Sequence, residues 1–146
     1  MDASEKILVL VLRISGVILL TALVPVVMPQ VWMDAIHRGL GMGPLPEGPI
    51  VGYLTRSLSA LYAYHGALVL FISLDVRRYL SLVKCFAVLG IAFAVILFVL
   101  DFMVGMPPWW TIAEGSSIAM LSCALLWLAG RVPRDPAPTS SSPGKR

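Results

Sequence analysis

Apolar residues fill four long stretches of this chain, and polar or turn-forming residues separate them. The stretches cover about residues 7–28, 51–74, 80–104 and 109–130. A hydrocarbon core about 30 Å thick needs roughly 20 helical residues to span it. Because each stretch is long enough, the pattern predicts an all-α membrane protein, a bundle of four transmembrane helices.

A shorter segment between the first two stretches is amphipathic. In residues 30–42, one helical face carries Trp32, Met33, Ile36 and Leu40, and the other carries Asp34, His37 and Arg38. A segment of this kind lies in the headgroup layer of a membrane. We therefore predict a short interfacial helix over about residues 30–42, supported by an ion pair between Asp34 and Arg38 at i, i+4 spacing.

The domain organisation is simple. Residues 1–132 form the predicted bundle, and residues 133–146, rich in Pro, Ser and charge, form a predicted disordered cytoplasmic tail. The turn after the second stretch is short, which predicts that helices 51–74 and 80–104 are antiparallel neighbours. Small residues at Ser59, Gly66, Gly115 and Ala119 predict faces where helices approach closely.

Composition and charge support a membrane location. Hydrophobic residues make up 58% of the chain and charged residues only 13%, so a soluble globular protein is excluded. No run of aromatic and basic residues suits nucleic acid, so no nucleic-acid partner is expected. Basic residues flank one side of the four spans: Lys6, Arg13, Arg77, Arg78, Lys84, Arg131, Arg134, Lys145 and Arg146. The positive-inside rule therefore predicts that both termini are cytoplasmic, and Arg77, Arg78 and Lys84 are expected to contact anionic membrane lipids.

Three charged residues from three different stretches form the first candidate site. Arg56, Asp101 and Glu114 are each expected near the outer membrane boundary, where an unpaired charge is costly. One interpretation is an ion-pair clamp that fixes the order of the helices. The other is an outward-facing polar pocket that binds a small solute, with His37 and Asp34 of the interfacial segment lying over it as a lid.

Three further titratable residues are candidates for a functional or structural role. His65 lies deep in the second stretch, where it is either a proton relay or a neutral imidazole that makes one hydrogen bond. Arg13 and Asp75 are expected near the inner boundary, where they form a structural ion pair unless Arg13 extends to the headgroups. No spacing of His, Cys, Asp or Glu indicates a metal site, and no cofactor is expected.

Catalytic signatures are absent from the sequence. No GxSxG element and no Ser, His and Asp arrangement accompanies the serines, and no glycine-rich phosphate loop follows a strand. We therefore do not expect an enzyme.

Four segments resemble an uncharacterised family of small four-span bacterial inner-membrane proteins. They are residues 32–38 (WMDAIHR), 53–66 (YLTRSLSALYAYHG), 75–79 (DVRRY) and 105–115 (GMPPWWTIAEG). The layout is also loosely similar to DoxX-like proteins. The resemblance implies a bacterial inner-membrane location and the four-span topology, but no reaction, because function does not follow from architecture.

Two functions remain open from the sequence. The preferred one is a small accessory or structural membrane protein that packs against a second copy or another membrane protein. The alternative is a protein that binds or transports a small solute through the outward-facing polar cluster. Short loops and small-residue faces favour the first, and the polar second helix favours the second.

Overall fold

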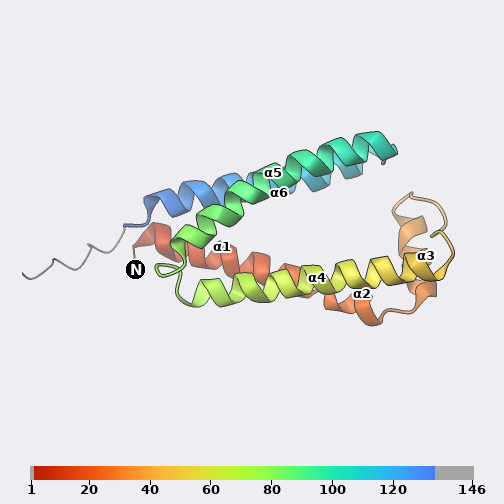
Figure 1. The fold of residues 1–146 in the computed structure, drawn as a ribbon, viewed down its shortest axis with the longest axis horizontal. Coiled ribbons are helices and arrows are strands. Elements are labelled where there is room, and N and C mark those ends of the chain that lie inside the picture. Colours follow the sequence, from red (N-terminus) through yellow and green to blue (C-terminus); the bar gives the residue numbers. More distant parts are fainter. Residues whose placement is uncertain (1, 134–146) are drawn as a thin grey trace, which may run out of the picture.

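The fold is all-helical throughout the part of the chain that the computed structural model describes, residues 2–133 (Figure 1). In chain order its helices are α1 (Ala3–Leu20), α2 (Leu23–Val27), α3 (Gln30–Gly39), α4 (Pro49–Leu74), α5 (Leu80–Val104) and α6 (Pro108–Arg131). Four helical stretches are long and apolar enough to cross a membrane, if α1 and α2 count as one span. The predicted fold class is confirmed. Of the predicted tail, residues 134–146 lie outside the described residues.

The first span begins earlier than predicted and is interrupted. The Asp2 carboxylate accepts a hydrogen bond of 2.7 Å from the Glu5 backbone N–H, so it caps α1 and the helix starts at Ala3 instead of residue 7. α1 then ends at Leu20, before α2 begins at Leu23. Pro25 lacks an N–H, and its ring disfavours a helical carbonyl four residues earlier, at Thr21. The proline therefore explains why the helix breaks at this point.

The long helices pack as two pairs. α1 and α2 lie against α4, α5 lies against α6, and α1 also touches α6. A Cβ placed on Gly66 of α4 would lie 2.8 Å from the Gly16 carbonyl oxygen of α1, so these two backbones are in contact. In the other pair, Gly90 of α5 faces the Ser122 hydroxyl of α6. Small residues thus allow both close approaches, as the sequence predicts for Gly66.

The hydrophobic core lies at one end of the molecule. We call this the terminal end, because both ends of the described chain and the 75–79 turn lie there; the opposite end, with α3 and the 105–107 turn, is the loop end (Figure 1). The core residues are Leu8, Leu12, Val69, Ile72, Val76, Leu80, Val83, Leu128, Ala129 and Val132. They come from α1, α4, α5 and α6, with Val76 from the turn after α4 and Val132 from just after α6, so all four spans meet in this core.

The two pairs diverge from the terminal end toward the loop end. Figure 1 shows α4 and α5 leaving their short turn in different directions. The prediction that these helices are neighbours along their length is therefore wrong. Each is held by a different partner: Gly66 fixes α4 against α1, and Gly90 fixes α5 against α6. Contact between α4 and α5 includes the rings of His65 and Phe86, whose centroids are 5.5 Å apart.

Candidate functional site

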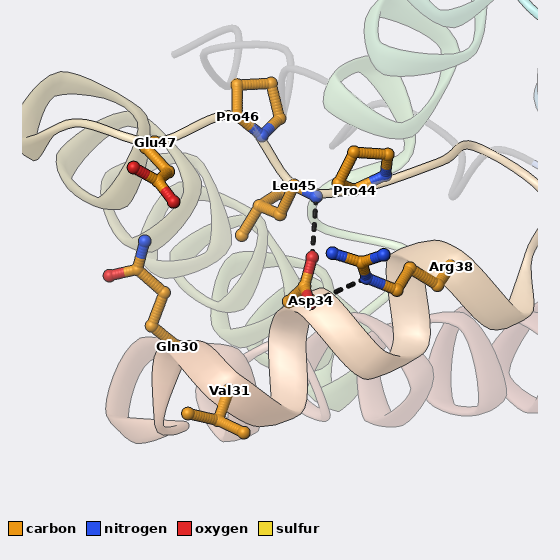
Figure 2. A pocket seen from close by; sticks show the side chains of 8 residues that line it. All are labelled: Gln30, Val31, Asp34, Arg38, Pro44, Leu45, Pro46 and Glu47. Atoms are coloured by element: carbon orange, nitrogen blue, oxygen red, sulfur yellow. Dashed lines mark hydrogen bonds and ion pairs between the residues drawn. The ribbon is translucent and has the colours of Figure 1, made fainter.

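The loop end contains α3 and the segment that returns from it to α4. The Asp34 carboxylate accepts a hydrogen bond of 2.7 Å from the Leu45 backbone N–H. It also forms an ion pair with Arg38, whose Nε lies 2.8 Å away (Figure 2). The predicted pair of Asp34 and Arg38 is thus confirmed. These contacts, the Leu45 N–H first and Arg38 second, hold the pKa of Asp34 below its ordinary value of 3.8.

His37 holds the same segment from the next turn of α3. Its Nδ1–H donates a hydrogen bond of 2.9 Å to the Gly43 carbonyl. Gly41 and Gly43 have φ values of 75° and 80°, which glycine adopts without strain. His37 and Asp34 were predicted to cover the charged cluster as a lid. In the structure their side chains instead fasten the return segment onto α3.

A hollow of about 620 Å³ lies between α3 and this segment. It is lined by Gln30, Val31, Asp34, Arg38, Pro44, Leu45, Pro46 and Glu47. Figure 2 shows the side chains of Gln30 and Glu47 extending toward one another at one side of it. Asp34 and Arg38 are engaged with each other, and Arg38 is largely exposed. The hollow therefore has both acidic and basic side chains in its lining. Both oxygens of the Asp34 carboxylate already accept hydrogen bonds, from Leu45 and Arg38.

Arg56 is held by backbone oxygens. Its Nη2 donates a hydrogen bond of 3.1 Å to the Met28 carbonyl, just after α2, and its Nη1 donates one of 3.3 Å to the Gly52 carbonyl. Within residues 2–133 no ion pair joins it to Asp101 or Glu114. The structure therefore does not form the predicted clamp. The break in the first span brings a free carbonyl to Arg56, so the guanidinium satisfies the end of a helix.

Asp101 lies in the seam between α5 and α6. Only 7% of the residue is exposed, and its buried Oδ2 has no hydrogen-bond partner among residues 2–133. Thr111 of α6 is also buried in the described structure. A buried carboxylate oxygen without a partner is unusual in a folded protein. Because the packed seam covers this oxygen, Asp101 is not open to a solute in the conformation described.

Glu114 is the accessible member of the predicted cluster. Its Oε2 accepts a hydrogen bond of 2.8 Å from the indole N–H of Trp110, one turn earlier on α6. A hollow of about 290 Å³ adjoins it, lined by Trp109, Trp110, Ala113 and Glu114. These four residues lie on the face of α6 away from Thr111 and Gly115, which are buried.

The remaining predicted residues lie toward the terminal end. His65 is exposed, and its ring is tilted against that of Phe86. The predicted ion pair of Arg13 and Asp75 is not formed within the described residues. The pair at this end is instead Glu5 with Arg77, which share two hydrogen bonds of 3.0 and 2.9 Å. The Asp75 carboxylate accepts a hydrogen bond from the Arg78 backbone N–H, so it caps the turn.

Sequence reasoning missed the two tryptophans as site residues. Trp109 and Trp110 entered the sequence analysis only within the 105–115 segment that carries the family resemblance. The i, i+4 spacing of Trp110 and Glu114 was the available signal, because it places an indole N–H beside a carboxylate on one helix face. The hollow beside them could not be predicted, because it depends on how the two rings pack.

Neither a metal site nor a known relative defines the chemistry of this region further in the described residues. No group of three or more His, Cys, Asp or Glu residues in residues 2–133 could hold a metal ion. Comparison of the chain with protein-family models, with curated proteins and with solved structures found no match.

Proposed function

We propose that this chain is a multi-pass membrane protein that binds a small solute at its loop end, without converting it. One observation carries the proposal: the charged residues there, on α4, α5 and α6, form no ion pairs with one another in the described structure. Arg56 bonds to carbonyls, and Glu114 bonds to an indole beside an open hollow. This is the alternative that the sequence analysis left open.

The free-energy cost of the Glu114 charge, unpaired within the described residues, supports the presence of a bound solute. A charged side chain near the hydrocarbon region costs several kcal/mol by simulation and about 2.5–3.5 kcal/mol by insertion scales at the helix centre. Glu114 lies six residues into α6, about 9 Å along the helix from its first residue. Its carboxylate has one hydrogen bond to Trp110 and no cationic partner in the described residues. A bound solute of complementary chemistry would compensate for this cost.

Native mass spectrometry of the protein in a mild detergent tests the proposal. We expect an added mass of small-molecule size on the wild-type chain and its loss from Glu114→Gln. Glu47→Gln is the matched control, since Glu47 is a loop-end acid that lines the other hollow. A wild-type spectrum without any small added mass, or one that Glu114→Gln leaves unchanged, would contradict solute binding at this site.

An accessory role is the second candidate, and the shape of the molecule favours it. The main hydrophobic core cluster lies at the terminal end, and the helix pairs diverge toward the loop end (Figure 1). A second copy or another membrane protein could pack against those diverging halves. The faces at Gly66 and Gly115 are used within the chain, however, against Gly16 and Phe98. In the same spectra, an intact oligomer or a co-purified protein without a small ligand would favour this role.

We further propose a bacterial inner-membrane location with both termini in the cytoplasm. Basic residues gather at the terminal end, near the starts of α1 and α5 (Lys6 and Lys84) and in the turn between α4 and α5 (Arg77). Arg131 stacks on Trp127 at the same end, its guanidinium carbon 3.7 Å from the ring centroid, as expected of interface anchors. A periplasmic reporter fused after residue 146 should be inactive, and strong reporter activity would reverse the orientation.

A further inference from the structure

The hollow on α6 combines a carboxylate with two aromatic rings. Trp109 and Trp110 meet edge to face, with centroids 5.5 Å apart and an angle of 79° between the ring planes. Glu114 lies at the same hollow, fixed through its hydrogen bond to Trp110. The face of an indole ring is electron-rich and attracts cations, and Trp is the most effective of the aromatic side chains in this role. Both kinds of group therefore select for positive charge.

We propose that this hollow binds a small organic ammonium cation. The proposal rests on the proposed solute-binding function and names the class of solute for that site. The ammonium group would lie against the free side of the Glu114 carboxylate and the indole rings, and its carbon substituents would contact Ala113 and the tryptophans.

The lining of the hollow argues against other ligand classes. It contains no basic residue, so an anion would meet the Glu114 charge without compensation. A single carboxylate also provides too few ligands for Ca²⁺, which takes six to eight oxygens, or for Zn²⁺, which takes three or four protein ligands. The volume of about 290 Å³ is at the lower limit of the range for drug-sized ligands. The ligand should therefore be a small cation with apolar substituents.

A pair of probes that differ only in charge tests this inference. Benzyltrimethylammonium carries a quaternary nitrogen, and neopentylbenzene has carbon in its place with the same shape. Binding is followed by calorimetry and by fluorescence in a Trp32→Phe/Trp127→Phe background, which keeps only Trp109 and Trp110. We expect saturable binding of the cation and none of the neutral isostere.

Variants of the lining then locate the binding. Glu114→Gln should weaken binding of benzyltrimethylammonium at least about tenfold, because it removes the negative charge that attracts the quaternary nitrogen. Trp109→Leu should weaken it by about 2- to 30-fold, the range of one cation–π contact. Glu114→Asp, which keeps the charge, should bind more tightly than Glu114→Gln. Glu47→Gln should bind like the parent, and circular dichroism with elution volume confirms the fold of each variant.

Each contrary outcome has a distinct meaning. Absent saturable binding of the cation, equal binding of the isostere, or binding that Glu114→Gln leaves unchanged would each overturn the ammonium inference. If native spectra still showed a neutral or anionic solute that depends on Glu114, solute binding would stand and only the ligand class would be wrong. If no solute were found either, the proposed function would fail as well.

Discussion

At the scale of single residues, Gly66 and Gly16 decide how closely α1 and α4 approach. A Cβ on Gly66 would lie 2.8 Å from the Gly16 carbonyl oxygen and 2.9 Å from the Leu20 backbone nitrogen. Both neighbours are backbone atoms, which cannot move aside as a flexible side chain does. Glycine is therefore needed here for the space it leaves, and not for its backbone freedom, since neither residue has positive φ.

Substituting Gly66 with alanine should separate the two helices. Overpacking of a close contact typically costs about 1–3 kcal/mol, so we expect Gly66→Ala to lower the free energy of unfolding in mixed micelles by that amount. Gly130→Ala is the matched control, because a Cβ there meets nothing within 4 Å. Equal stability of the two variants would show that the α1–α4 contact is looser than described.

The sequence predicted residue types in the site better than their partners. The small face at Gly66 follows from spacing alone, and so does the pair of Asp34 with Arg38, because both lie within one helix. The partner of Arg56 does not, because the Met28 carbonyl becomes available only where the first span is broken. Arg77 likewise reaches Glu5 across 72 positions, a contact that no local pattern reveals.

At the scale of elements, the observed bounds of three long helices lie close to those predicted from the apolar stretches and the turns between them. The predicted helix over 80–104 matches α5, and α4 and α6 extend past their predicted bounds by at most two residues. A proline at the start of α4 and of α6 explains why both begin earlier than apolar residues alone suggested. The first span departed most, because a polar cap at Asp2 and a break before Pro25 are both local effects that hydropathy does not register.

The link between α3 and its return segment should depend on pH through Asp34. Its pKa is lowered in the folded protein, so the charged form contributes stability that is fully present above about pH 4 and is lost as pH falls through the lowered value. The Leu45 amide proton resonance should therefore titrate with an inflection below pH 3.8. Asp34→Asn should abolish that inflection, and Glu47→Gln should keep it.

An inflection at pH 3.8 or above would contradict the described contacts. It would mean that the Leu45 N–H and Arg38 do not favour the charged form of Asp34, contrary to their distances of 2.7 and 2.8 Å. The same result would weaken the assignment of α3 and its return segment as one closed unit.

At the scale of the whole molecule, helix pairing could not be predicted from loop length. The short 75–79 turn suggested that α4 and α5 are neighbours, yet each packs along its length against another helix. Sequence spacing identifies a face that allows close approach but not which helix will occupy it. The choice is set by the fit of small residues on opposite helices, Gly66 with Gly16 and Gly90 with Ser122.

This pairing separates the loop-end charges, so they do not form the ion-pair clamp that the sequence suggested. Arg56 lies in the α4 pair, and Asp101 and Glu114 lie in the α6 pair. A clamp between them would hold the diverging pairs together, whereas a site leaves Glu114 available to a solute. These two roles differ in energetic coupling, since residues without shared contacts contribute to stability almost additively.

A double-mutant cycle between Arg56 and Glu114 therefore tests the central claim most directly. The free energy of unfolding in mixed micelles is measured for the wild type, Arg56→Gln, Glu114→Gln and the double variant. A site without a clamp predicts a coupling energy below about 0.5 kcal/mol. A coupling of about 1 kcal/mol or more would show that the two charges stabilise each other in the folded bundle, and it would contradict the assignment of Glu114 to a solute.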